Sequence, residues 1–147
     1  IYSAVVVSGV NQTIDLSEIA VPDDLTVLVL QNEINTDANF EIIKKVPKST
    51  FVILNAAPAL TPNKDFFERI DLLIVNQLEA KMLLNEEPSI FNNLDALRKL
   101  QNLGPKEVII TLGAEGYTGI SKNGEIFSEP GIKVDVLSTH MGQAIAL

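Results

Sequence analysis

Leu-Leu-Ile-Val-Asn-Gln-Leu-Glu-Ala-Lys-Met-Leu-Leu, residues 72–84, joins an apolar run to a helical pattern with almost no loop between them. The run 72–75 has the length and apolar character of a buried strand, and a helix is expected over 77–84. Three further runs of this kind occur at 26–30, 50–54 and 108–112. Because the runs are nearly continuous in hydrophobicity, they predict parallel strands covered on both faces.

Helical patterns lie between these runs. One helix is expected over 36–46, with Phe40, Ile43 and Val46 inward and Pro47 ending it. The clearest is expected over 89–103, capped by Ser89 and ended by Gly104. Its apolar stripe consists of Phe91, Leu94, Leu97, Leu100 and Leu103.

Strands that alternate with helices imply right-handed crossovers. The pattern therefore predicts an α/β fold with a doubly wound, mostly parallel sheet flanked by helices. After residue 112 the pattern changes, because 116–120 and 126–128 are short strand-like segments separated by Asn123-Gly124. This spacing predicts a C-terminal hairpin.

The composition limits the function. A net charge of −8 argues against nucleic-acid binding through a basic surface, since such binding needs Lys and Arg against phosphates. The longest apolar runs fall far short of the roughly 20 residues of a membrane helix, and no signal peptide is visible. The absence of cysteine excludes a disulfide framework and a thiolate metal site. We expect a cytoplasmic protein that acts on small molecules.

Polar residues follow each of the four runs. In an open parallel sheet, ligands bind beyond the carboxyl ends of the strands. Clustered polar groups that include a carboxylate suit a phosphorylated ligand and its hydrated Mg²⁺. Each group also has an ordinary explanation, because Asn and Gly are common in turns and a Glu on a helix often faces solvent. The four groups are Gln31-Asn32-Glu33, residues 55–59, Asn76 with Glu79, and residues 113–116.

Four motifs in this order resemble one family. They are Leu-Gln-Asn-Glu-Ile (30–34), Ile-Leu-Asn-Ala-Ala-Pro-Ala (53–59), Val-Asn-Gln-Leu-Glu-Ala (75–80) and Ile-Thr-Leu-Gly-Ala-Glu-Gly (110–116). They resemble the strand ending in Glu-Ile, the Asn-Pro-Ala-Pro segment, the Asn-x-x-Glu motif and the Thr-Leu-Gly-x-x-Gly loop of the ribokinase-like, or phosphofructokinase B, family. Order and spacing agree over about residues 25–139.

The resemblance implies ATP-dependent phosphoryl transfer to a sugar hydroxyl. The motifs at 30–34 and 53–59 are closer to the ribokinase branch than to the adenosine kinase or phosphofructokinase branches, so ribose is the first expectation. A nucleoside or another hexose as acceptor is the alternative. The dinucleotide fingerprint Gly-x-Gly-x-x-Gly follows none of the expected strands, which argues against a hydride-transfer enzyme.

The resemblance also implies roles for particular residues. Glu33 would face the sugar, and Ser-Gly-Val-Asn (8–11), which is similar to the family's Pro-Gly-Ala-Asn, would place Asn11 near the substrate. Asn76 and Glu79 would organise the ATP phosphates and their Mg²⁺, with Glu79 acting through bound water. The nucleotide would also lie along Thr111, Leu112, Gly113, Ala114, Glu115 and Gly116.

One family element is missing. In the family, a Gly-Ala-Gly-Asp stretch stabilises the phosphoryl oxyanion, and its Asp removes the sugar hydroxyl proton. Here Ser138-Thr139-His140 leads directly into Met141, although both flanks are similar to those of the family. We expect the catalytic Asp in a short loop that is missing between His140 and Met141. The alternative is a real deletion, which would leave a catalytically inactive nucleotide-binding module.

His140 is the only histidine, but general base work in this family belongs to an Asp. The resemblance instead implies that Ser138 and His140 lie where some relatives bind a monovalent cation such as K⁺ through backbone oxygens.

The chain is expected to be a single ribokinase-like α/β domain over 1–147, incomplete at both ends. The family's N-terminal sugar-binding segment and the part that helps to enclose the adenine are not in the sequence. Further compressions are expected between Val7 and Ser8 and near 47–49. A homodimer stays open, because the segment that forms the dimer lid of many relatives lies largely outside these residues.

Overall fold

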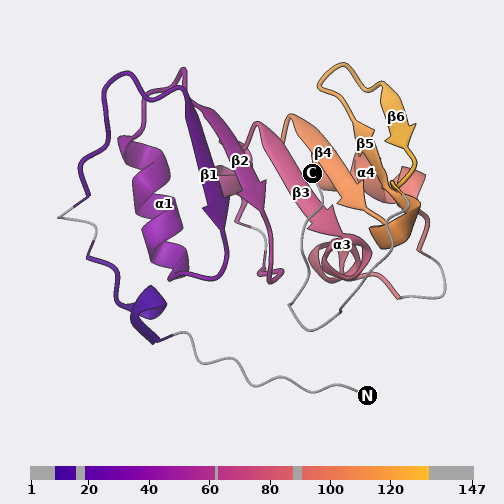
Figure 1. Cartoon of the computed structure of the whole chain (residues 1–147), viewed down its shortest axis with the longest axis horizontal. Helices are drawn as coiled ribbons and strands as arrows, with labels where there is room; N and C mark the ends of the chain where they lie inside the picture. Colours follow the sequence, from indigo (N-terminus) through magenta and orange to yellow (C-terminus); the bar gives the residue numbers. More distant parts are fainter. Residues whose placement is uncertain (1–8, 16–18, 62, 88–90, 133–147) are drawn as a thin grey trace.

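The computed structural model describes residues 9–15, 19–61, 63–87 and 91–132. Its sheet has the strand order β1-β2-β3-β4-β5-β6 (Figure 1). The first four strands pair in parallel, and the last two are antiparallel. The strands are β1 (Val27–Gln31), β2 (Phe51–Asn55), β3 (Leu72–Asn76), β4 (Glu107–Thr111), β5 (Tyr117–Ile120) and β6 (Ile126–Glu129).

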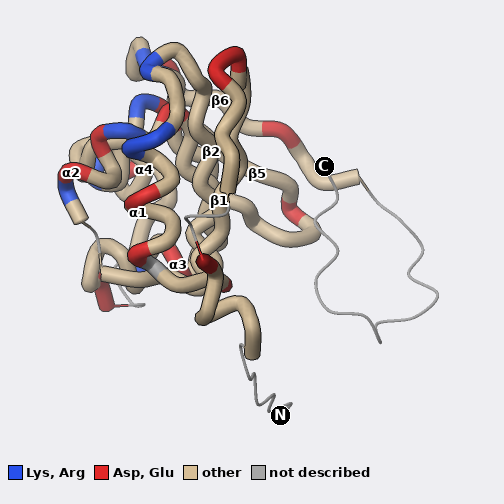
Figure 2. The backbone as a smooth tube through the Cα atoms, turned by 90° about the vertical axis from the view of Figure 1, so that its left-hand side faces the viewer, with Lys and Arg blue, Asp and Glu red and all other residues tan. Residues whose placement is uncertain are grey.

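Helices connect the parallel strands. A short 3₁₀ turn, η1, precedes the sheet, and another, η3, follows β4. The helical elements are η1 (Gly9–Gln12), α1 (Thr36–Lys45), α2 (Lys64–Phe67), α3 (Gln77–Leu84), α4 (Asn93–Gln101) and η3 (Gly113–Glu115). The predicted mostly parallel α/β sheet flanked by helices, with a C-terminal hairpin, is confirmed. The doubly wound arrangement, with helices on both faces, is not found in the described residues (Figure 2). None of the helices in the described residues is long and apolar enough to cross a membrane.

All four α-helices lie on the same side of the sheet, as the edge-on view in Figure 2 shows. The cause is topological, because each right-handed crossover carries the chain to the next strand in the same direction. The expectation that both faces of the strands are covered is therefore wrong for the described part of the chain. On the open face, Val27, Val29 and Phe51 are 48%, 63% and 40% exposed.

The core lies between the sheet and the helices. Alternate residues of each central strand point into it, which gives β3 and β4 the same pattern of buried and half-buried side chains. Its fully buried strand and helix members include Val52, Leu54, Leu73, Val75, Val108, Ile110, Ala80, Ala96, Leu97 and Leu100.

Helix boundaries differ from the expectations for α1 and for α4, which was expected over 89–103 and spans Asn93–Gln101. α3 spans the predicted residues, and α1 ends one residue earlier than predicted, with Val46 as its C-cap. α4 begins at Asn93 and is capped by Asn92, whose side chain accepts from the amides of Leu94 and Asp95. The cap expected at Ser89 lies outside the described residues. The short α2, which begins after the cap Asn63, was not predicted, since four residues carry no periodicity.

The hairpin forms where Asn123-Gly124 predicted it. Gly124 has a φ of +81°, whereas Asn123 does not have a positive φ. A two-residue type I′ turn would need positive φ at both positions. The longer connection is closed by hydrogen bonds from the Ser121 amide to the Glu125 carbonyl and from the Gly124 amide to the Ser121 carbonyl.

Candidate ligand-binding edge

The strand register aligns the polar strand ends on one edge of the sheet. Gln31 is the register partner of Asn55, and Asn55 is the partner of Ile74 on β3. Asn76 is the register partner of Thr111 on β4. The groups that follow the four parallel strands in sequence therefore share the carboxyl edge, where open α/β sheets bind ligands.

Asn76 and Glu79 form a capping box at the start of α3. The Asn76 side-chain oxygen accepts from the Glu79 amide at 2.9 Å, and the Glu79 Oε2 accepts from the Asn76 amide at 2.8 Å. The two residues thus satisfy backbone donors that the first turn of a helix otherwise leaves unpaired. The cap explains their positions without a ligand. It also holds both side chains in a fixed geometry.

Asn76 and Glu79 each have one polar side-chain group that the capping box does not use. Within the described residues, neither the side-chain NH₂ of Asn76 nor Oε1 of Glu79 has a hydrogen-bond partner. Both residues are half-buried. An amide donor and a carboxylate acceptor are therefore available where β3 leads into α3.

The loop after β4 lies beside this pair. Thr111 Oγ1 donates to the Val75 carbonyl at 3.4 Å, which ties the end of β4 to that of β3. The Leu112 amide donates to the Gly116 carbonyl, and the Gly116 amide donates to the Gly113 carbonyl. The amides of Gly113 and Ala114 have no hydrogen-bond partner in the described residues. Consecutive free amides of this kind can face an anion.

The side chain of Glu115 does not favour an anion. It is exposed and adds a negative charge to the same loop. A phosphate against that carboxylate would be repelled. Backbone amides are thus the anion-binding groups that this loop offers.

Glu33 and Asn11 form a second group, at the end of β1. Glu33 is exposed in a turn. The residue before it, Asn32, donates from Nδ2 to the Pro58 carbonyl at 2.9 Å. The Asn35 amide donates to the Asn11 carbonyl at 3.2 Å, which ties η1 to the start of α1. The structure thus brings Asn11 and Glu33 to one corner. β2 separates this corner from the Asn76–Glu79 pair on β3.

Sequence reasoning named Asn32 but not its contact, and it missed Asn35 altogether. Asn35 caps α1 by accepting from the Asp37 amide at 2.9 Å, and Asn32 anchors the turn to the segment after β2. That segment contains a cis peptide bond between Ala57 and Pro58. An Asn directly before a helical pattern was the available signal for the Asn35 cap.

Metal binding is limited by the acidic groups present. Among the described residues, no group of three or more His, Cys, Asp or Glu side chains could enclose a metal ion. Mg²⁺ keeps much of its water shell and binds proteins through one or two carboxylates. The free oxygen of Glu79 fits this mode. Ser138, His140 and the junction between His140 and Met141 lie outside the described residues.

A hollow of about 280 Å³ opens beside the loop after β4. Gln77 Nε2 donates to Asn93 Oδ1 at 3.2 Å, so the starts of α3 and α4 meet near it. Its walls come from the start of α4, from Leu112 and from the hairpin residues Thr118 and Ser128.

These features define a class: an open α/β domain with polar side chains and free backbone amides at the carboxyl edge of its sheet, the edge where such sheets bind ligands. The model of the pfkB family of carbohydrate kinases matches residues 10–140. The chain therefore belongs to the pfkB family of carbohydrate kinases, and the resemblance seen in the sequence is confirmed.

Individual relatives agree with this assignment. The chain is 35% identical over 119 residues to a ribokinase of Schizosaccharomyces pombe, an alignment that covers 77% of this chain and 37% of that protein. It is 31% identical over 123 residues to a ribokinase of Arabidopsis thaliana, covering 78% and 32% of the two chains. The crystal structure of ribokinase from Thermotoga maritima superposes with a TM-score of 0.77 at 29% identity, covering 92% of this chain and 46% of that one. The chain thus spans less than half the length of these relatives.

Proposed function

We propose that the protein transfers a phosphoryl group from ATP to a hydroxyl group of a sugar, with ribose as the first candidate. Membership of the family and the ribokinases among the relatives support this proposal. The observation that carries it is the Asn76–Glu79 pair with its spare donor and acceptor, held directly opposite the loop that begins at Thr111.

The pair would act on the phosphates and their metal. The Asn76 NH₂ can donate to a phosphate oxygen, and the free Glu79 oxygen can accept from a water on Mg²⁺. Bound Mg²⁺ neutralises charge on the phosphates. Because the capping box fixes both side chains before a ligand arrives, no ordering of either residue is required on binding.

The neighbouring loop would hold the rest of the nucleotide. In this proposal, residues 111–116 contact it through backbone groups, with the free amides of Gly113 and Ala114 facing an anionic oxygen. Glu115 would point its carboxylate away from that oxygen.

Glu33 and Asn11 are proposed to face the sugar from the end of β1. A carboxylate and an amide are both able to bind sugar hydroxyls. ADP formation, measured with ribose and separately with a nucleoside such as adenosine, distinguishes the two classes of acceptor. We expect ribose to support ADP formation and adenosine not to do so.

We propose that an Asp in a loop missing between His140 and Met141 removes the proton from the sugar. No residue in the described part is proposed for that role. Ser138 and His140 are proposed to bind a monovalent cation such as K⁺. The chain is proposed to be one ribokinase-like domain, incomplete at both ends, of a cytoplasmic enzyme that forms homodimers.

The junction between His140 and Met141 decides whether the protein is an active enzyme. Mass spectrometry of the tryptic peptide that begins after Lys133 reads this junction in the natural protein. Extra residues that include an Asp support the kinase. A peptide in which His140 is bonded to Met141 would instead leave an inactive nucleotide-binding module.

Glu79→Gln tests the proposed metal role. A Gln can still accept from the Asn76 amide, so the cap and the folding stability should persist. In the natural protein, the loss of charge should weaken Mg²⁺-dependent ATP turnover about 10- to 100-fold, as for other groups that hold a metal indirectly. Glu125→Gln, an exposed substitution in the hairpin, is the matched control and should leave turnover unchanged. Equal turnover in both variants would contradict the proposal.

A further inference from the structure

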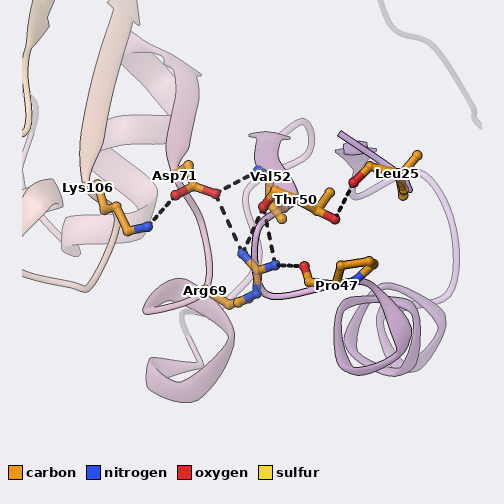
Figure 3. A network of polar contacts seen from close by, with 7 residues as sticks. All are labelled: Leu25, Pro47, Thr50, Val52, Arg69, Asp71 and Lys106. Atoms are coloured by element: carbon orange, nitrogen blue, oxygen red, sulfur yellow. Dashed lines mark hydrogen bonds and ion pairs between the residues drawn. The ribbon is translucent and has the colours of Figure 1, made fainter. Parts of the chain in front are cut away.

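Asp71 is a buried carboxylate at the edge of the sheet opposite to the ligand-binding groups. The residue directly precedes β3, and its side chain is 8% exposed. Figure 3 shows its carboxylate in contact with Lys106, Val52 and Arg69. Oδ2 accepts from the Val52 amide at 2.8 Å, and Oδ1 pairs with the Lys106 ammonium group. Both carboxylate oxygens are therefore in use.

The main chain of Asp71 makes two further strand contacts. Its amide donates to the Val52 carbonyl at 2.9 Å, and its carbonyl accepts from the Glu107 amide at 2.9 Å. One residue thus connects β2, β3 and β4. Asp71 and Val52 exchange two hydrogen bonds, because each amide donates to the other residue. The Asp71 carboxylate takes the place of the backbone carbonyl that accepts in an ordinary strand ladder.

Arg69 extends the network toward β1. Its Nη1 lies 3.6 Å from Asp71 Oδ2. The guanidinium group also donates to the carbonyls of Pro47, at 2.9 Å, and Thr50, at 3.3 Å. Thr50 Oγ1 in turn donates to the Leu25 carbonyl at 2.7 Å, just before β1. The turn between α1 and β2 is therefore tied to the same carboxylate.

The ladder that Asp71 extends is short. β2 and β3 share three register pairs, whereas β1 with β2 and β3 with β4 share five each. Val52 is fully buried, so its amide would be unpaired without the carboxylate. An unpaired buried donor is strongly disfavoured, and a slip of β3 by one residue would create one. Such a slip would also move every β3 side chain to the opposite face.

We propose that Asp71 is a positioning residue whose carboxylate sets the register of β3 against β2 and thereby holds Asn76 and Glu79 at the ligand-binding edge. β3 is five residues long and leads into α3 without a loop, so a change of register at Asp71 reaches the capping box undiminished. The claim that this register serves nucleotide binding rests on the proposed function. The claim that Asp71 sets the register does not depend on it.

Cysteine cross-linking measures the register, because the chain contains no cysteine of its own. Ile53 and Leu72 are register partners on the open face, and Ile74 is two residues further along β3. Paired Cα atoms on adjacent strands lie about 4.8 Å apart, and the offset pair about 8 Å apart. Disulfides need Cα separations of about 4.4–6.8 Å. The pair I53C/L72C should therefore oxidise at least about tenfold faster than I53C/I74C.

Asp71→Ala should bring this ratio of rates close to one, because β3 then lacks the bond that fixes its register. Asp71→Asn should keep a ratio near that of the parent, since its amide oxygen can still accept from Val52. If Asp71→Ala does not fold, Asp71→Glu replaces it. Glu keeps the charge beside Lys106 and Arg69 but displaces the carboxylate from Val52, so the ratio should fall here too.

Leu100→Ala controls for a loss of stability alone. It truncates a fully buried side chain on α4 and should leave the ratio unchanged. A ratio that stays at the parent value in a folded Asp71→Ala or Asp71→Glu variant overturns the inference, as does an equal fall in Leu100→Ala. Because these rates are measured without nucleotide, failure of the proposed function would appear separately, as an absence of nucleotide binding in the parent chain.

Discussion

Gly113 and Gly116 lie three residues apart in the same loop, and both have a positive φ, +60° and +95°. Their surroundings differ. A Cβ on Gly113 would meet nothing within 4 Å, whereas a Cβ on Gly116 would lie 2.0 Å from the Glu129 carbonyl oxygen. The loop therefore needs glycine at 113 for backbone conformation alone, and at 116 for space as well.

This difference predicts unequal effects on stability. Gly113→Ala should cost about 1–2 kcal/mol, the usual penalty of a left-handed conformation. Gly116→Ala should cost roughly 4 kcal/mol or more, because the Glu129–Gly131 backbone must move as well. Urea unfolding of the two variants measures both values. Equal losses would show that the packing against β6 does not constrain the loop.

Asn76 and Asn92 are both N-cap residues, and they provide a matched test of function against capping. Asn76→Ala and Asn92→Ala should each cost about 1 kcal/mol of stability. Only Asn76→Ala should also weaken binding of Mg²⁺-ADP, because Asn92 caps α4 through its oxygen and has no proposed nucleotide role. Calorimetric titration of both variants would contradict the assignment if they lost affinity to the same extent.

At this scale the sequence was informative about the site but not about its geometry. The motif around Asn76 and Glu79 indicated the residues, and their spacing is also that of a capping box. It could not show which atoms the cap uses and which it leaves free. The role of Asp71 was not predicted, since it depends on contacts with Val52 and Lys106 that are distant in sequence.

α4 shows the limits of sequence periodicity for a single element. The predicted stripe included both Leu94 and Leu97, but Leu97 is fully buried and Leu94 is 49% exposed. The helix begins only at Asn93, so Leu94 lies in its first turn. Ala96, which the stripe omitted, is fully buried instead.

Alanine substitutions on α4 should reflect this arrangement. Leu97→Ala should destabilise the chain by about 2–5 kcal/mol, as for other core leucines. Leu94→Ala should change stability by less than about 1 kcal/mol. Thermal unfolding of the two variants would refute the observed helix orientation if Leu94→Ala proved the more damaging.

The far side of α4 is charged. Lys99 bridges Asp95, at 2.6 Å, and Glu86, at 2.7 Å, and these hydrogen bonds raise its pKa above the ordinary value of 10.5. A pKa that is higher in the folded than in the unfolded state stabilises the protein fully at pH values below the unfolded pKa. This stabilisation is lost only as the pH rises from there through the folded pKa. The bridge therefore connects α4 to the segment after α3 throughout the neutral range.

The whole described molecule is a sheet with helices on one side (Figure 2). Apolar runs correctly predicted the four parallel strands, but not their consecutive order in the sheet. They did not reveal the open face. A strand that is apolar on both faces has the same sequence pattern whether or not helices of the described residues cover both faces of the sheet. The relatives are more than twice as long as the part they share with this chain.

This open face predicts dye binding by the chain in isolation. Val27, Val29 and Phe51 expose apolar surface on neighbouring strands, and such patches bind hydrophobic dyes and promote self-association. Val29→Thr keeps a β-branched side chain and should lower dye fluorescence with little loss of stability. Leu94→Gln, on the helical side, is the control. An equal decrease in both variants would show that the open face is not the binding surface.

Chemical-shift mapping of the ¹⁵N-labelled chain with Mg²⁺-ADP tests the central claim, that the carboxyl edge of β3 and β4 holds the nucleotide. The account predicts saturable shifts that are largest at the amides of 76–79 and 111–116, and that weaken in Glu79→Gln. Saturable shifts centred on the opposite edge, around Asp71 and Lys106, or no saturable shifts at all, would contradict it.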